Sequence, residues 1–336
     1  MQHLYPPYYG DFHCIAQRCP DSCCHEWDVQ IDPDTARRYH ELPGALGEDL
    51  RDAMYEDSGD VYLRNCDGRC PMWQQDGLCR IQCALGHNAL SQVCREFPRI
   101  TQDYGSFVEH ALEMSCPEAA RLILTDDRQG LDTTQTPDDQ APDYDAELMD
   151  LLIRTRPAAY AILEDDRFSV PQRLAVLLLY GYHVQSQIDG AEEVPFDPQA
   201  ALAEAAGFAA EGSISALTGF FRELEILTDR WRDTLEHAHA PHWEQALTRL
   251  ARYGIYRYFY QAVCDYDLVS RVKFVVIFCI MMAYLSAPSL DGLIAGAQLF
   301  SKEIENDSEN MDALLDGAYT APALTDANLL GLLLRI

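Results

Sequence analysis

The chain has 336 residues, and its hydrophobic fraction of 48% is normal for a globular protein and excludes wholesale disorder. Its 54 acidic residues outnumber its 25 basic residues and give a formal net charge of −29. This charge argues against a nucleic-acid partner, because binding to phosphates requires a basic surface. An acidic surface either keeps the protein soluble or suits a cationic partner, such as lysine side chains of another protein.

The N-terminal sequence MQHLYPPYYGDF has no basic stretch followed by an apolar run, so we predict no secretory signal. The longest apolar run, residues 274–285, is too short to span a bilayer and predicts a buried helix. We therefore expect a cytoplasmic protein without membrane insertion. Its cysteines should stay reduced there, which favours thiolate ligands over disulfides.

Residues 1–125, here called the head, contain signals for short helices. Asp32-Pro33-Asp34 predicts a helix that begins with Asp32 as N-cap and ends near Leu42. Residues 86–97 predict a second helix, which Pro98 ends. Cys116-Pro117-Glu118 predicts the start of a third helix, whose dipole should favour the thiolate form of Cys116.

Residues 126–145 are polar, acidic and proline-containing, and they predict a linker or mobile loop. Residues 146–336, here called the body, show apolar residues at spacings of three and four throughout, as in Leu148-Leu151-Leu152. The predicted fold is mainly α: a cysteine-rich metal-binding head with short helices, followed by an α-helical body. The aromatic stretch 253–260 predicts either a core helix or a wall that faces a substrate.

Ten of the twelve cysteines lie within the first 116 residues. Cys14, Cys19, Cys23 and Cys24 form a tight C-x4-C-x3-C-C group, and thiolates this close together need a cation between them. More distant cysteines follow at positions 70, 79, 94 and 116. A tight loop combined with distant ligands is typical of a metal site that closes the chain around the ion.

The identity of the metal stays open between two tetrahedral zinc sites and an iron–sulfur cluster with additional structural ligands. Adjacent cysteines such as Cys23 and Cys24 favour a bulky cluster or two shared metals, because their side chains diverge along an extended backbone. This observation points toward iron–sulfur.

The segments FHCIAQRCPDSCCHEWDVQID, CPMWQQDGLCRIQCALGHNALSQVCREFPRI and SCPEAARLIL resemble the flagellin lysine-N-methylase (FliB-type) family and the related proteins with a cysteine-rich zinc- or iron-chelating domain. The resemblance covers most of residues 10–125. It implies that the metal ligands are Cys14, Cys19, Cys23, Cys24, Cys70, Cys79, Cys94 and Cys116. Cys66 and Cys83 are additional to the family pattern.

The resemblance also implies transfer of a methyl group from S-adenosylmethionine to the ε-amines of lysines on flagellin or another lysine-bearing protein, with an iron–sulfur cluster, of the 4Fe-4S type, taking part. The C-x3-C-x2-C loop of radical enzymes is absent, as are phosphate-loop, Rossmann, zinc-protease and serine-hydrolase motifs. S-adenosylmethionine would therefore bind outside a Rossmann-type site. Direct coordination to an open iron of the cluster is one hypothesis.

Two further groups of residues are candidates for roles in this chemistry. Arg95 and Arg99 flank Cys94, and either could hold a carboxylate of the cofactor or form a structural salt bridge. A methylase must also deprotonate lysine, whose reference pKa is about 10.4, so it needs a base or a desolvated site. Four acidic residues beside cysteines are either candidate bases or ordinary surface acids: Glu26, Asp28, Glu96 and Glu118. Three histidines are candidates to complete a mixed Cys/His metal site: His13, His25 and His87.

Two rival functions remain at this point. One is a non-catalytic metal-binding or redox module in which two zinc ions only fold the head. The other is an electron carrier or iron–sulfur scaffold without methyl chemistry.

Overall fold

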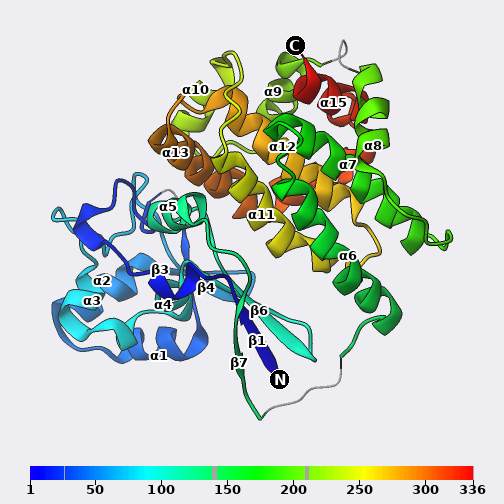
Figure 1. Ribbon diagram of the computed structural model, residues 1–336. Helices are drawn as coiled ribbons and strands as arrows, with labels where there is room; N and C mark the ends of the chain where they lie inside the picture. Colours follow the sequence, from blue (N-terminus) through cyan, green and yellow to red (C-terminus); the bar gives the residue numbers. More distant parts are fainter. Residues whose placement is uncertain (26, 138–141, 209–211, 336) are drawn as a thin grey trace.

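The structure is a computed structural model, and it describes residues 1–25, 27–137, 142–208 and 212–335. Parts of the predicted linker (138–141) and of the predicted body (209–211 and 336) lie outside the described residues. The strands and short helices lie on one side of the molecule and the longer helices on the other (Figure 1). The prediction of a mainly α protein is confirmed, but the head also contains strands that we did not predict.

The head contains two small β-sheets. One sheet has the order β5-β6-β1-β7, in which β1 pairs with β6 in parallel and the other pairs are antiparallel. The other sheet has the antiparallel order β2-β4-β3. Strands of three to six residues are too short to show a clear alternation in sequence. Their bounds are Gln2–Tyr5 (β1), Val29–Ile31 (β2), Met54–Asp57 (β3), Asp60–Leu63 (β4), Arg99–Asp103 (β5), Phe107–Leu112 (β6) and Asp132–Gln135 (β7).

Strand β7 lies within the predicted linker, and all four of its residues are exposed. It pairs with β1 at the N-terminus of the chain, with Gln2 opposite Gln135. A strand of four polar residues gives no hydrophobic signal, so only the pairing with β1 reveals it.

Two of the three helices predicted in the head are confirmed. In α1 (Pro33–Glu41), the Asp32 side chain accepts a hydrogen bond from the Thr35 amide, and α5 (Pro117–Thr125) begins directly after Cys116. The head also contains α2 (Gly44–Ala53) and α3 (Arg80–Leu85).

The single helix predicted over residues 86–97 is wrong. Residues His87–Ala89 form a 3-10 turn, and α4 (Gln92–Glu96) begins anew because the Ser91 side chain caps it by accepting from the Cys94 amide. Serine inside a helical pattern favours a cap over continuation, and that preference decides here.

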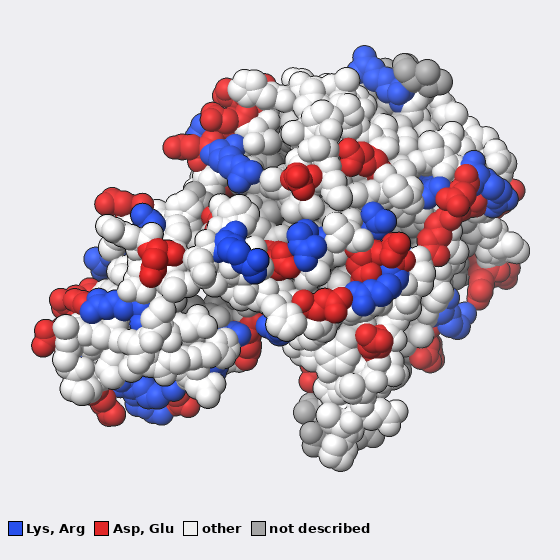
Figure 2. All heavy atoms as spheres, turned by 60° about the vertical axis from the view of Figure 1, so that its left-hand side comes forward, with Lys and Arg blue, Asp and Glu red and all other residues white. Residues whose placement is uncertain are grey.

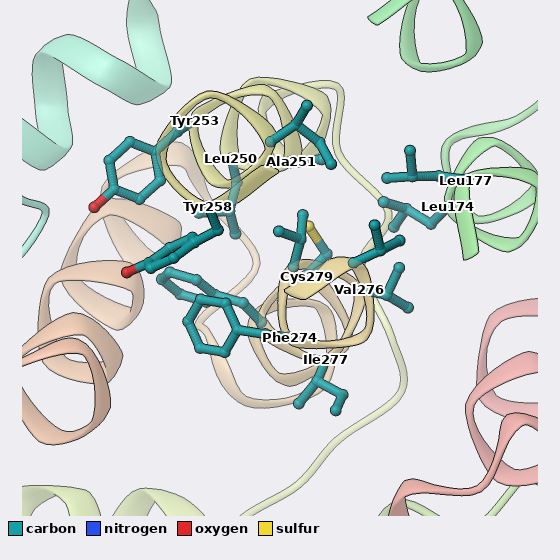
Figure 3. Close-up of a cluster of buried hydrophobic side chains, with 14 of the residues drawn as sticks. Leu174, Leu177, Leu250, Ala251, Tyr253, Tyr258, Phe274, Val276, Ile277 and Cys279 are labelled. Carbon is teal, nitrogen blue, oxygen red and sulfur yellow. The ribbon is translucent and has the colours of Figure 1, made fainter. Parts of the chain in front are cut away.

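The body is helical, as predicted, and α12 lies at its centre. All residues of α12 are buried, as the apolar run 274–285 predicts, and the helix packs against α7, α11 and α14. Side chains from α7, α11 and α12 meet in one apolar cluster (Figure 3). The helices are α6 (Ala146–Glu164), α7 (Val170–Ile188), α8 (Pro198–Ala205), α9 (Ile214–Arg222), α10 (Asp229–Glu236), α11 (Ala246–Tyr258), α12 (Val269–Leu285), α13 (Leu290–Phe300), α14 (Ser308–Thr320) and α15 (Asp326–Leu334).

Two glycines allow neighbouring helices to approach α12 closely. A Cβ atom on Gly254 of α11 would lie 2.6 Å from a methyl carbon of Val275, and one on Gly181 of α7 would lie 3.0 Å from Val272. These contacts place α11 and its aromatic residues directly on the central helix. Among the described residues, no helix is both long enough and apolar enough to cross a membrane.

Candidate functional site

The cysteine loop, residues 14–24, contains little regular structure. Its only helical turn among the described residues is the 3-10 turn Ala16–Arg18, and Ala16 itself has a positive φ of 49°. The Cys70 amide donates a hydrogen bond of 2.8 Å to the Cys24 carbonyl, which joins the loop to the segment around Cys70. All twelve cysteines of the chain are free thiols in the structure.

A first set of thiols gathers around Cys24. The thiols of Cys23 and Cys70 lie next to the Cys24 sulfur and stabilise its thiolate, which lowers the pKa of Cys24 and raises the pKa of both neighbours. Burial raises the pKa of both Cys79 and Cys94. The two thiols also lie close enough to Cys24 for its negative charge to raise their pKa further. Residues from four separate segments of the head therefore meet around one sulfur atom.

A second set lies at the N-terminus of α5. Cys14 and Cys19 are close enough to Cys116 to affect its ionisation. Burial raises the pKa of Cys116 to about 12, although the amides of Ala119 and Glu118 favour its thiolate. The N-terminus of α5 favours this thiolate, as we predicted, but the cost of burying the charge outweighs that effect.

The eight predicted ligands thus fall into two neighbouring sets. All of their donor atoms are cysteine sulfurs, which are the ligands that zinc and iron–sulfur clusters prefer. They do not form a complete ligand sphere: in the part of the chain that the structure describes, no three His, Cys, Asp or Glu side chains converge as metal ligands would. Cys66 and Cys83 are exposed.

The predicted cofactor-binding arginines lie on opposite sides of the Phe97-Pro98 peptide. Arg95 donates a hydrogen bond of 2.9 Å to the Leu90 carbonyl, and this contact folds its side chain back onto the start of α4. The Arg99 guanidinium lies 5.0 Å from the ring centre of Phe12 and 5.8 Å from that of Tyr9. Among the described residues, no carboxylate forms an ion pair with either arginine, so the predicted salt-bridge alternative has no partner there.

The candidate bases have structural partners. Asp28 accepts from the Tyr55 hydroxyl and the Asn65 amide, and Glu118 accepts two hydrogen bonds from Arg121. Glu96 accepts from Gln92 on the exposed surface of α4. Glu26 lies outside the described residues.

The candidate histidines occupy different places around the head. His13 bonds the Asp11 carbonyl, and His87 lies in the 3-10 turn before α4. His25 follows the cysteine loop directly, and its ring lies 3.4 Å from Asp21 of that loop.

An ion pair connects the cysteine loop to the body. Lys302 lies in a π-helical turn (Ser301–Glu305) that continues α13, and its side chain is only 1% exposed. Its ammonium group lies 3.2 Å from Asp21, which also accepts from Gln298 and lies between Cys19 and Cys23. Burial opposes ionisation of Asp21, but Lys302 and the hydrogen bonds outweigh it and lower the pKa of Asp21.

A second buried polar cluster lies on the same π-helical turn. The hydroxyls of Tyr253 and Tyr258 point the same way out of the apolar cluster (Figure 3), and both donate to Glu305 Oε1, at 3.0 and 2.5 Å. Arg257 lies between two carboxylates, 3.8 Å from Glu305 and 4.0 Å from Glu113. Burial, opposed by Arg257, raises the pKa of Glu113 to about 7.

This cluster was missed in the sequence because its members come from the residue after β6, from α11 and from the π-helical turn, which no spacing connects. Buried charged residues and π-helical turns are both frequent at functional sites. The aromatic stretch 253–260 is part of the core, and the polar atoms of Tyr253, Arg257 and Tyr258 belong to this cluster.

The chain resembles known proteins over part of its length. It is 32% identical over 128 residues to flagellar biosynthetic protein FliU of Salmonella muenchen, and the match covers 36% of this chain and 76% of that protein. It is 31% identical over 128 residues to the lysine-N-methylases of Salmonella choleraesuis (strain SC-B67) and Salmonella typhimurium (strain LT2), covering 36% of this chain and 32% of each.

These matches define a class of bacterial proteins named for flagellar biosynthesis and lysine methylation. The chain belongs to the family of FliU and the FliB-type lysine-N-methylases. The aligned segment spans about a third of the two lysine-N-methylases. No family model and no solved structure matches the chain.

Proposed function

We propose that this protein is a protein-lysine N-methyltransferase of the cytosol that uses S-adenosylmethionine as methyl donor. The observation that carries the proposal is its membership of a family in which two curated members are named lysine-N-methylase. Flagellin is the proposed acceptor, because the third relative is named for flagellar biosynthesis. Another lysine-bearing protein is the alternative acceptor.

The cysteine head is proposed to hold a metal centre, with Cys14, Cys19, Cys23, Cys24, Cys70, Cys79, Cys94 and Cys116 as ligands. The gathering of thiols from separate segments around Cys24 supports this proposal. A 4Fe-4S cluster is the preferred group and zinc the alternative. When bound, such a centre would supply a Lewis-acidic or electron-rich site in the head.

Methyl transfer itself requires a neutral amine. The lone pair of the lysine nitrogen forms the new N–C bond, the S–C bond of the donor breaks, and its electron pair leaves with the sulfur of S-adenosylhomocysteine. The proton of the amine must pass to a base. Glu113 is our candidate, because burial raises its pKa to about 7 and it lies in the polar cluster behind Tyr253.

The surface charge of the protein supports a cationic partner. Asp and Glu side chains are spread over the face shown in Figure 2, with arginines between them. A net charge of −29 attracts a lysine-bearing acceptor over distances of about a Debye length, ~8–10 Å at physiological salt.

The direct test is a mass measurement on the acceptor. Protein purified without oxygen is incubated with S-adenosylmethionine and flagellin, and each methyl group should add about 14 Da to a lysine-containing peptide, a gain that follows from replacing H by CH3. Flagellin with its lysines changed to arginine is the negative control. An unmodified wild-type flagellin, together with normal S-adenosylmethionine binding, would contradict flagellin as the acceptor.

The protein provides an internal control for this assay. Its only lysines are Lys273 and Lys302, whose side chains are 4% and 1% exposed and pair with Asp326 and Asp21. Self-methylation should therefore be absent, and any methyl incorporated should be found on the acceptor. Metal analysis of the same preparation separates the rivals, because stoichiometric zinc without methyl transfer would favour the non-catalytic module.

A further inference from the structure

A cleft of about 280 Å³ opens between the N-terminal segment and the helices of the body, just below the range of about 300–1,000 Å³ that is usual for small-molecule sites. Its walls come from the segment after β1, from the end of α5 and the loop after it, and from α6 and α11. None of the residues proposed as metal ligands lines it. Its apolar walls include Pro6, Ile123 and Pro157.

Two tyrosine hydroxyls face this cleft without a partner. Tyr8 is only 9% exposed, and neither its hydroxyl nor that of Tyr160 makes a hydrogen bond to any residue that the structure describes. Tyr160 is close enough to affect the ionisation of Tyr8, and burial raises the pKa of both. Unpartnered hydroxyls beside a cavity are the groups that a ligand satisfies.

The charges in the cleft favour a ligand with a carboxylate. Arg252 pairs with Glu164 at 2.8 Å, and Arg128 pairs with Asp126 at 2.8 Å. Arg249 differs, because its guanidinium donates to the Leu124 carbonyl at 3.2 Å and no carboxylate of the described residues lies within 4 Å of it. One guanidinium of the cleft is therefore left for an anionic group.

We propose that this cleft binds the S-adenosylmethionine molecule of the proposed methyl transfer, so the inference rests on the proposed function. Of the two substrates of that reaction, only the methyl donor carries both a carboxylate for Arg249 and a flat base for the rings of Tyr8 and Tyr160. The side chain of an acceptor lysine carries no group that could pair with the Arg249 guanidinium. The sulfonium of the donor suits the ring of Tyr8, because tyrosine rings attract cations. The Tyr160 ring already has the Arg156 and Arg252 guanidinium groups at 5.9 and 5.8 Å from its centre.

The cleft also borders the buried polar cluster. Tyr253 lines the cleft, and its hydroxyl donates to Glu305. The side chain of Tyr253 therefore lies between a donor bound in this cleft and the cluster that contains Glu305 and Glu113.

The test is a binding measurement on the full-length protein, purified without oxygen, by titration calorimetry with S-adenosylmethionine. Arg249→Gln should weaken binding at least tenfold, and the double variant Tyr8→Phe/Tyr160→Phe should weaken it several-fold. Methionine competes only if the carboxylate end is recognised, and adenosine only if the base is. Arg154→Gln, in a different cleft of the body, is the matched control and should bind normally.

Two results would overturn the proposal. One is normal binding by Arg249→Gln combined with loss of binding in Arg95→Gln or Arg99→Gln, which would move the donor to the cysteine head. The other is absence of any binding by wild-type protein that holds its full metal content. Binding that depends on Arg249 without methyl transfer to any acceptor would instead refute the proposed function and leave the cleft assignment intact. Circular dichroism and the melting temperature of each variant exclude misfolding as the cause.

Discussion

The head and the body of this protein are stabilised in different ways. The body surrounds a helix whose residues are all buried, and its aromatic side chains pack in a continuous cluster that includes Phe274, Phe278 and Phe300. The apolar cluster within the head is small and includes Cys70, with Cys24, Cys79 and Cys94 packed against it. Small apolar cores are marginal on their own and commonly depend on a metal or disulfides. The thiols therefore contribute to folding of the head, whereas the body folds around its apolar core.

The largest effect is expected from removing the central sulfur of the head. Cys24→Ser should abolish metal binding and unfold the head, because structural metal sites contribute about 10 kcal/mol or more of apparent binding energy to folding. Metal content and limited proteolysis of the head report both effects. Cys264→Ser, at an exposed cysteine of the body, should change neither. Normal metal content in Cys24→Ser would contradict the ligand assignment.

A core substitution in the body should lower the stability of the body without changing the metal content of the head. Phe278 is 1% exposed and stacks on Phe300 with ring centres 4.1 Å apart. Phe278→Ala should lower the free energy of unfolding of the body by about 3–5 kcal/mol while leaving the metal content unchanged. Leu290→Ala, at a 40% exposed position, should cost less than about 0.5 kcal/mol in the same urea titration. Loss of metal in Phe278→Ala would show that the two regions are not separately stabilised.

The link between the two regions can be tested at its ion pair. Asp21→Asn leaves the Lys302 ammonium buried without its Asp21 carboxylate, and this should cost about 3 kcal/mol, the low end for a buried pair because Asp21 is 19% exposed. Urea unfolding followed separately in the head and the body should show both regions weakened. Asp34→Asn removes an exposed ion pair to Arg37 and serves as the control, with an effect within about 0.5 kcal/mol. An unchanged stability in Asp21→Asn would mean that the pair does not couple the regions.

The smallest effect is expected from pH. Because the pKa of Glu113 is raised from its reference value of 4.5 to about 7, its contribution to stability is full at low pH and is lost as the pH rises toward and through 7. Glu113→Gln keeps a neutral side chain at every pH. Its stability relative to wild type should therefore rise between pH 5 and pH 8, by up to about 3 kcal/mol. If the free energies of unfolding of Glu113→Gln and wild type changed with pH in parallel, the raised pKa of Glu113 would be contradicted.

The sequence by itself determined the class of this protein. The periodicity of the body predicted its helices, the N-cap signals at Asp32 and Cys116 placed two helices of the head, and an apolar run marked the central helix. These features depend on local spacing, which a linear sequence records directly. The cysteine spacing likewise pointed to a thiol-rich head and to the family.

Only the tertiary structure decided the rest. The strands of the head are too short to carry a pattern, and Ser91 divides a helix that periodicity alone extends across residues 86–97. The sharing of thiols around Cys24, the pairing of Asp21 with Lys302, and the meeting of Glu113, Arg257 and Glu305 join residues up to 281 positions apart. Such contacts follow from packing of distant segments, and no local spacing encodes them.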